Sequence, residues 1–386
     1  MPAEQMLSEL EMPTIRKSAD PAFYVPQLDC LRFLAFFLVF LHHNIPVGNS
    51  TAQHVGAGFR HVLEIVRDTV GFGLSLFFFL SSYLITKLLV LEKNSKKTIS
   101  LRSFYIRRIL RIWPLYFAFL VTTAIIGHWL PSAHISIARF AAMSLLAGNW
   151  YSIFAGMGPF IIAPLWSISV EEQFYTVWPS AFRLFTRTAF IWFAVLVGAI
   201  SLTATAILAY RGSTSLDLWM NSFSESIFFA TGGLLALLGG DERKPNLLYA
   251  IPMIVGCGTI WLAAEAICKI NDRDVQPTPL HAASGYLLVA IGCALLLTGS
   301  LYFPSRLVPR WLIYLGKISY GLYVFHALAM YIVRNALDSL ARKLPGINLA
   351  IIFLITMVLS AFSYKYFEKP FLRLKSRFEL VKTRAA

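Results

Sequence analysis

Charged residues are scarce in this sequence, because Asp, Glu, Lys and Arg together make up only 14% of its 386 residues. Soluble globular proteins carry about 25% of these residues, so a sizeable water-soluble domain is not expected. Acidic residues are also fewer than basic ones, 20 against 34, which leaves a formal charge of +14. The basic residues cluster between hydrophobic segments, and this distribution favours a membrane protein with basic cytosolic loops over a nucleic-acid-binding protein.

Cysteine is scarce as well, and the motifs of several enzyme classes are missing. All four cysteines lie in or beside apolar runs without the spacing of metal ligands: Cys30, Cys257, Cys268 and Cys293. We interpret them as apolar filler. The sequence has no HExxH, CxxC or P-loop motif, which argues against metal-dependent and nucleotide hydrolysis, so no bound metal is expected. Residues 1–22 lack the pattern of a signal peptide and are predicted to be a short, disordered cytosolic tail.

Hydrophobic residues are abundant, at 57% of the chain, and the mean hydropathy is +0.64. Apolar runs of about 18–22 residues recur along the sequence, and a helix of that length crosses the hydrocarbon core of a bilayer. The predicted fold class is therefore all-α, a polytopic helical membrane protein with about ten transmembrane helices. The predicted spans lie near residues 28–45, 69–90, 112–130, 189–210, 224–239, 247–268, 281–303, 316–333 and 347–366.

Residues 139–182 form a further hydrophobic region, which glycine and proline interrupt and which could cross the membrane once or twice. A single net crossing places the basic end of the chain in the cytosol, as the positive-inside rule favours. We therefore predict one additional broken or re-entrant segment, with both termini cytosolic. Irregular backbone at membrane depth is tolerated where it lines protein or a cavity, so this region is also a candidate site. The predicted organisation is a tail (1–22), a transmembrane domain (23–372) and a basic cytosolic C-terminal tail (373–386).

The first hydrophobic segment carries an arginine and a histidine eleven residues apart, Arg32 and His43. At about 100° per residue, the two side chains share one helical face, roughly 16 Å apart along the axis. Asp29 lies one turn before Arg32 and can pair with it. A cation at membrane depth costs at least about 2.5–3.5 kcal/mol, so such residues usually face a bundle interior or an aqueous cavity. The pattern indicates a site within the membrane, with Arg32 towards the cytosol and His43 in the outer half.

The next two clusters each have an ordinary structural explanation beside the functional one. In the phenylalanine-rich run that contains Ser81 and Tyr83, small residues allow a neighbouring helix or a ligand to approach closely. In the loop that follows, Arg108 and Arg111 are one helical turn apart and can hold a diphosphate with forked hydrogen bonds. Basic residues near lipid headgroups can equally serve membrane topology.

Two more clusters lie further along the chain. Trp166, Ser167 and Glu171 recur at helical spacing inside a membrane-like stretch, where a carboxylate is costly unless it is paired or functional. A structural salt bridge from Glu171 or Glu172 to one of the arginines is the alternative. Tyr323 and His326 lie along one predicted helical face. Taken alone, His326 is more often a hydrogen-bonded interior histidine than a reacting one.

Together these motifs resemble membrane-bound acyltransferase family 3, the multi-pass O-acyltransferases, over about residues 24–372. The matching positions, in chain order, are Leu28, Asp29, Leu31, Arg32 and His43, then Phe77 to Ile85, Arg108 and Arg111, Trp166, Ser167 and Glu171, Ser319, Tyr320 and His326, and Glu368 and Pro370. Two positions depart from the family pattern, because Cys30 and Ser82 stand where the family has glycine. The SGNH esterase domain that some members append after the membrane core is expected to be absent.

The resemblance implies a cytosolic acyl-CoA donor, most often acetyl-CoA, and an acceptor hydroxyl on a sugar, polysaccharide or lipid-linked glycan. It places the protein in the inner (plasma) membrane, in contact with lipids and not with nucleic acid. His43 is implied as general base, with Glu171 and Asp29 as further catalytic residues. The implied donor-binding residues are Arg32, Arg108, Arg111, Ser81, Tyr83, Trp166 and Ser167, and His326 and Tyr323 are assigned to acceptor binding or structure.

The alternative is a secondary transporter or flippase for a lipid-linked or anionic substrate, which buried Arg, His and Glu side chains would serve equally well. A transporter moves its substrate without consuming CoA, whereas an acyltransferase releases a free thiol.

Overall fold

The computed structural model describes residues 23–45, 56–239, 244–272, 275–336 and 345–381. These residues form helices and no strand, so the predicted all-α class is confirmed for the described part of the chain. The longer helices are α1 (Pro26–Asn44), α3 (Ala57–Gly71), α4 (Gly73–Lys96), α5 (Leu101–Ile126), α8 (Trp166–Leu184), α9 (Arg187–Tyr210), α11 (Ser222–Leu238), α12 (Leu247–Cys268), α13 (Pro279–Tyr302), α15 (Ser319–Ala336) and α17 (Pro345–Ser363). The shorter ones are α6 (Ile137–Ser144), α7 (Gly148–Ala155), α10 (Ser215–Met220), α14 (Arg310–Lys317) and α18 (Lys369–Ser376).

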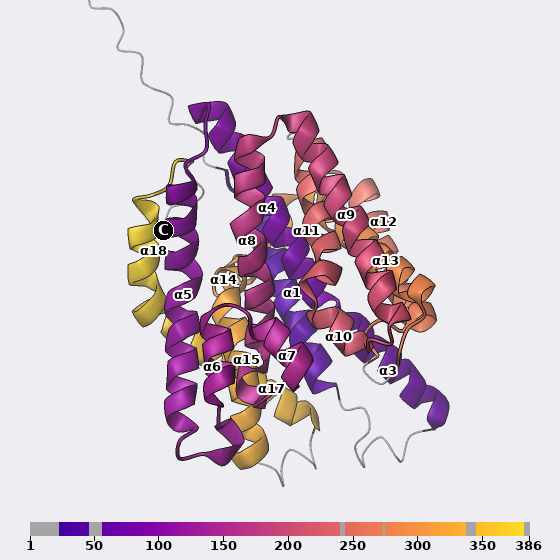
Figure 1. The fold of residues 1–386 in the computed structure, drawn as a ribbon, viewed down its shortest axis with the longest axis vertical. Coiled ribbons are helices and arrows are strands. Elements are labelled where there is room, and N and C mark those ends of the chain that lie inside the picture. Colours follow the sequence, from indigo (N-terminus) through magenta and orange to yellow (C-terminus); the bar gives the residue numbers. More distant parts are fainter. Residues whose placement is uncertain (1–22, 46–55, 240–243, 273–274, 337–344, 382–386) are drawn as a thin grey trace, which may run out of the picture.

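The helices form one bundle with α1 and α4 in its middle. Figure 1 shows α5 and α18 along one edge of the bundle and α9, α12 and α13 along the opposite edge. Helix α1 is apolar on most of its surface, and its side chains from Leu31 to Phe40 pack largely inside the protein. A helix that is hydrophobic all round belongs in the interior of a bundle, which explains the central position of α1.

Six helical stretches among the described residues are long and apolar enough to cross a membrane. The pair α14 and α15, which is bent by 72°, raises this number to seven if the two count as one span. The prediction of about ten transmembrane helices is therefore not confirmed. Helices α1 and α8 are not apolar enough to be counted as spans, because polar residues such as Asp29 and Glu171 lower their mean hydropathy. Helix α11 is too short to be counted, since it has only 17 residues.

The region 139–182 is broken, as its glycines and prolines predict. It consists of α6, α7, a 3-10 turn (Phe160–Leu165) and α8. Two glycines before the 3-10 turn, Gly156 and Gly158, have φ values of +76° and +71°, a backbone conformation that other residues rarely adopt. Only α8 within this region has the length of a long helix, and it begins with the residues of the predicted Trp166 cluster.

Two segments differ from their predicted form. The stretch with Arg108 and Arg111, predicted as a loop, lies inside α5 and is therefore held rigidly on one helical face. At the other end of the chain, a π-helical turn (Tyr364–Glu368) leads from α17 into α18, which packs along α5. Residues 373–381 of the predicted C-terminal tail are thus ordered against the bundle, whereas 1–22 and 382–386 lie outside the described residues.

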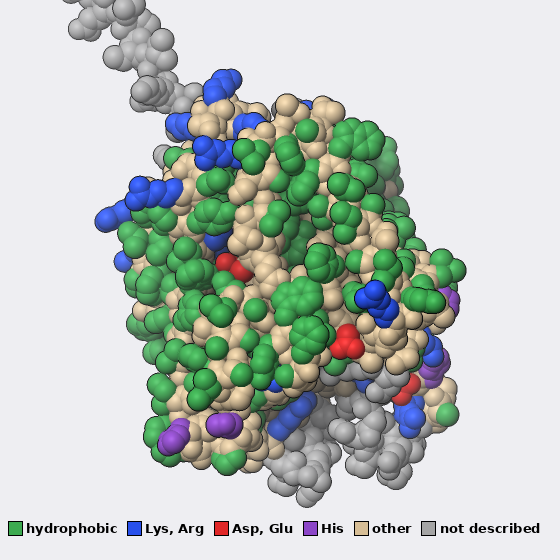
Figure 2. All heavy atoms as spheres, in the orientation of Figure 1, with side chains coloured by type: hydrophobic (Ala, Val, Ile, Leu, Met, Phe, Trp, Pro, Cys, Tyr) green, Lys and Arg blue, Asp and Glu red, His purple; other side chains and the backbone are tan. Residues whose placement is uncertain are grey.

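The surface is apolar around its middle and basic near one end. Figure 2 shows hydrophobic side chains over most of the visible face, with several Lys and Arg side chains near the upper end, where α4 ends and α5 begins in Figure 1, and others at the lower right. This distribution is typical of a helical protein whose middle is surrounded by lipid.

Candidate functional site

Two cavities meet at three arginines in the middle of the bundle. The first, which we call the vestibule, is lined by residues of α1, α4, α5 and the C-terminal segment, among them Glu92 and Lys375. The second, which we call the inner chamber, is lined by residues of α1, α4, α5, α8 and α15. Arg32, Arg108 and Arg111 line both cavities and form what we call the arginine junction.

Arg32 reaches the junction from α1. Its guanidinium lies 3.5 Å from the carboxylate of Asp29, so the predicted pairing of these residues is confirmed. Asp29 is almost fully buried, and α14 packs directly against its backbone at Gly316. A Cβ atom on Gly316 would come within 2.0 Å of the carbonyl oxygen of Asp29, so glycine is required for this approach.

Arg108 and Arg111 reach the junction from α5. The Arg108 guanidinium lies over the rings of Phe104 and Tyr175, at 5.5 Å and 5.3 Å from their centroids. Such ring contacts orient a guanidinium and leave its N–H groups available to other acceptors. Among the described residues, no carboxylate lies within 4.0 Å of Arg108 or Arg111. Two of the three arginines of the junction, Arg108 and Arg111, therefore carry positive charge that no direct ion pair with a described residue neutralises.

The inner chamber combines aromatic walls with a few hydroxyl groups. The Ser81 and Tyr175 hydroxyls are 2.5 Å apart, and the Ser167 and Tyr323 hydroxyls are 2.7 Å apart. Glu171 also lines this chamber, on the same helix as Ser167. A cavity that combines aromatic surface with placed polar groups is suited to an elongated organic ligand that has both apolar and polar parts.

His43 lies at the end of α1 away from Arg32. Its Nδ1 is 2.9 Å from the carbonyl oxygen of Val39. A carbonyl oxygen can only accept, so this nitrogen carries the proton and Nε2 is the proton-accepting nitrogen of the neutral ring. The guanidinium of Arg334, on α15, donates to the backbone carbonyl of His43 at 3.2 Å and fixes the end of α1.

His326 lies between the inner chamber and His43. Its ring centroid is 5.6 Å from that of Tyr323, which lines the chamber, and 5.3 Å from that of His43. The side chain is fully buried, and Nδ1 donates to the carbonyl oxygen of Tyr323 at 2.6 Å. Its Nε2 has no hydrogen-bond partner among the described residues. Tyr323, His326 and His43 thus form a line of ring contacts from the chamber to the far end of α1.

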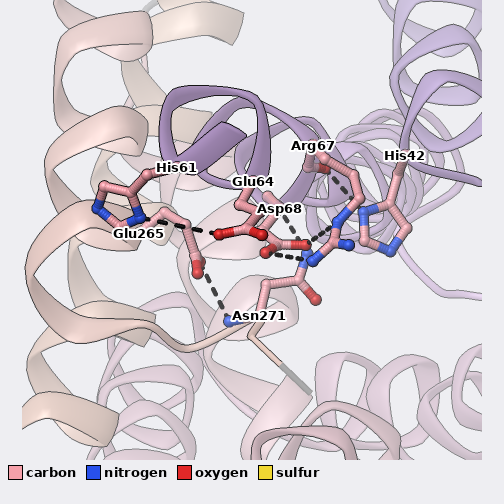
Figure 3. Close-up of polar contacts among 7 residues, drawn as sticks. All are labelled: His42, His61, Glu64, Arg67, Asp68, Glu265 and Asn271. Carbon is pink, nitrogen blue, oxygen red and sulfur yellow. Dashed lines mark hydrogen bonds and ion pairs between the residues drawn. The ribbon is translucent and has the colours of Figure 1, made fainter. Parts of the chain in front are cut away.

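A polar network fixes the neighbouring histidine, His42, to α3 (Figure 3). The Nδ1 of His42 donates to the carbonyl oxygen of Arg67 at 2.8 Å, and the Arg67 guanidinium forms two hydrogen bonds of 2.8 Å with Asp68. The Asn271 amide donates to the Asp68 carbonyl at 2.6 Å, and the Asn271 backbone donates to Glu265 at 3.1 Å. The network joins α1, α3 and the end of α12, and so holds the region beside His43 in place.

The structure does not bring every predicted site residue to the cavities. Tyr83 and Trp166, predicted to bind the donor, are buried in the hydrophobic core and line neither the vestibule nor the chamber. Glu171 does line the inner chamber, and its predicted role in orienting His43 or the acceptor stays a prediction. In the described part of the chain, no group of three or more His, Cys, Asp or Glu side chains is arranged to hold a metal.

The site predicted from the sequence also left out residues that line the cavities, because helical periodicity does not show which face of a distant helix borders a cavity. The hydroxyl and aromatic residues Tyr175 and Tyr320 line the inner chamber, and Arg107 and Lys375 line the vestibule. The basic character of residues 373–386 was a signal, but it is equally consistent with a solvated cytosolic tail.

Comparison with known proteins gives a family match over most of the chain. The model of an acyltransferase domain matches residues 25–365. The peptidoglycan O-acetyltransferase OatA of Listeria monocytogenes is 24% identical over 374 residues, which cover 90% of this chain and 56% of the relative. The putative peptidoglycan O-acetyltransferase YrhL of Bacillus subtilis is also 24% identical over 374 residues, and the match covers 90% of this chain and 55% of that protein.

A putative O-acetyltransferase of Staphylococcus aureus is 25% identical over 378 residues, which cover 90% of this chain and 57% of the relative. The chain therefore spans little more than half the length of these curated relatives. No solved structure matches it.

Proposed function

The chain belongs to the acyltransferase-domain family, and from this premise we propose that it transfers an acyl group, most often acetyl, from acyl-CoA to a hydroxyl group of a sugar or polysaccharide. The family match and the apolar helices support a multi-pass membrane acyltransferase, and the relatives in the comparison are described as O-acetyltransferases, two of them as putative ones. The donor, the acceptor, the catalytic residues and the sidedness are the proposed parts.

The arginine junction is the observation that carries this proposal. Acyl-CoA is long and carries its anionic phosphates at one end and its thioester at the other. The junction offers Arg108 and Arg111, which have no carboxylate within ion-pair distance among the described residues, between the vestibule and the aromatic chamber. Guanidinium groups bind phosphates with paired hydrogen bonds. We place the donor diphosphate at the junction and its acyl end in the inner chamber.

His43 acts as the general base in this proposal. Its Nε2 takes the proton of the acceptor hydroxyl while the oxygen attacks the thioester carbonyl carbon. The carbon–sulfur bond then breaks, and the departing thiolate takes the proton back from the imidazolium. A placed base of this kind contributes about 10²–10⁴-fold to the rate. Because the ring of His326 lies between the chamber and His43, we expect a side-chain rotation of His326 to complete the path.

The acceptor is proposed to be a glycan that reaches the His43 end of the bundle. OatA and YrhL are described as peptidoglycan O-acetyltransferases, the latter as a putative one, which makes peptidoglycan or a related polysaccharide the first acceptor to test. The basic end with the vestibule is proposed to face the cytosol, where acyl-CoA is found, and the His43 end the opposite side of the inner membrane.

The test is acetyl-CoA binding and thiol release by the purified protein, with a peptidoglycan fragment as acceptor. We expect the wild type to bind acetyl-CoA and to release CoA thiol. Arg108→Ala should lose most of the binding, whereas His43→Ala should bind normally and release thiol about 10²–10⁴-fold more slowly.

Retained circular dichroism and monodisperse gel filtration would establish that both variants are folded. Full activity of folded His43→Ala would contradict the role of His43. A folded wild type that moves a labelled glycan without binding acetyl-CoA would favour the transporter.

A further inference from the structure

The C-terminal helix brings a lysine to the wall of the vestibule. Lys375 lies on α18, which packs along α5, and its side chain is largely buried there. The following turn is tied down as well, because the Arg107 guanidinium donates to the carbonyl oxygen of Phe378 at 2.8 Å. Lys375 is therefore a fixed part of the cavity wall and not a solvated charge on a tail.

The basic residues of the two cavities fall into two sets. Arg32, Arg108 and Arg111 line both the vestibule and the inner chamber, whereas Arg107 and Lys375 line the vestibule alone. A donor with its acyl end in the chamber and its diphosphate at the junction extends its nucleotide end into the vestibule. The cations found only in the vestibule therefore face the nucleotide, whose ribose carries a 3′-phosphate.

Of these two cations, Lys375 is the one that can leave its carboxylate partner and bind a phosphate group instead. Arg107 pairs with the buried carboxylate of Glu92 at 3.2 Å, in addition to its bond to Phe378, so it is committed to holding the fold. The ammonium of Lys375 lies 3.3 Å from the carboxylate of Glu379, one turn further along the same segment. Glu379 also lines the vestibule and thus occupies the position where a phosphate oxygen would meet the lysine.

We propose that Lys375 binds the ribose 3′-phosphate of the acyl-CoA donor and that Glu379 holds the lysine in place until the donor arrives. This inference rests on the proposed function. A phosphate monoester carries about −1.5 to −2 charges at neutral pH and offers three acceptor oxygens, so it is a stronger partner for an ammonium than one carboxylate. The C-terminal helix thereby distinguishes CoA thioesters from thioesters that lack the 3′-phosphate.

The test compares acetyl-CoA with acetyl-3′-dephospho-CoA in steady-state thiol release by the purified full chain. The wild type should have a KM for acetyl-CoA about tenfold lower than that for the dephospho donor, a difference of about 1.4 kcal/mol. Lys375→Met should raise the KM for acetyl-CoA to the level of the dephospho donor, and Lys375→Arg should keep most of the preference. Glu379→Gln should lower the KM for acetyl-CoA, because a competing anion is removed.

Two matched variants separate local recognition from general effects. Arg373→Met removes an exposed positive charge from the same helix at a position that does not line the vestibule, and should keep the tenfold preference. Arg108→Ala should raise the KM for acetyl-CoA and the KM for the dephospho donor by the same factor. Equal use of both donors by the wild type, or an equal loss for both donors in Lys375→Met, would overturn the role of Lys375. A folded wild type that releases no thiol from either donor would instead contradict the proposed function.

Discussion

Arg108 places a positively charged and oriented guanidinium group between the two cavities. The rings of Phe104 and Tyr175 set the plane of its guanidinium, and the same guanidinium borders both cavities. A lysine at this position would keep the charge but lose both the fork of N–H groups and the planar contact with the rings. The geometry of Arg108, beyond its charge, is thus what suits it to a diphosphate.

Replacing Arg108 with lysine should therefore raise the KM for acetyl-CoA by about tenfold and leave kcat within about twofold. Steady-state thiol release measures both constants. Arg102→Lys, at an exposed position of the same helix outside both cavities, should behave like the wild type. An Arg108→Lys variant with wild-type KM would show that charge alone suffices at this position.

At the scale of elements, the contact between α14 and α1 is the closest approach that shapes the site. Gly316→Ala should destabilise the protein by about 1–3 kcal/mol, because the new methyl group would overlap the carbonyl oxygen of Asp29. Acetyl-CoA binding should weaken at the same time, since α1 carries Arg32 into the junction. Thermal unfolding in detergent and a binding isotherm measure the two effects.

Gly258→Ala is the matched control for this prediction. Gly258 lies within α12, and a Cβ atom there would meet nothing within 4 Å. Alanine should leave the stability unchanged or raise it by up to about 1 kcal/mol, because it favours helix more than glycine does. A Gly316→Ala variant as stable as Gly258→Ala would contradict the tight contact.

The elements that sequence alone predicted well are those that depend on local rules. The range 247–268 matches α12 because Asn246 caps the helix and an apolar run fills it. The pairing of Asp29 with Arg32 needed only the three-residue spacing on a helix.

The contacts that sequence missed join residues far apart in the chain. Asn271 bonds to a residue 203 positions away, and Tyr83 and Trp166 lie on helices buried on several sides, where periodicity does not identify the face towards a cavity. For the same reason, Lys375 was predicted to lie in the cytosolic C-terminal tail and not in the wall of the vestibule.

At the scale of the whole molecule, the distribution of basic residues predicts the orientation of the bundle in the membrane. Lys96→Cys, at the last residue of α4 and at the basic end, should react with a membrane-impermeant maleimide only after the cells are opened. His134→Cys, after α5, should react in intact cells. The native thiols should contribute little background, because three are buried and Cys30 is half-buried.

Equal labelling of both variants in detergent would serve as the control for reactivity. The reverse pattern in intact cells, with Lys96→Cys labelled and His134→Cys protected, would contradict the cytosolic position of the vestibule.

The fully buried ring of His326 has a consequence for the cell as well as for the reaction. An inner membrane stores energy as gradients of protons and ions, and a cavity open at both ends would dissipate them. The aromatic line of Tyr323, His326 and His43 fills the space between the chamber and the far end of α1. In the proposed reaction, a rotation of the His326 ring would let a two-carbon acyl group pass this barrier without opening a continuous path for ions through the protein.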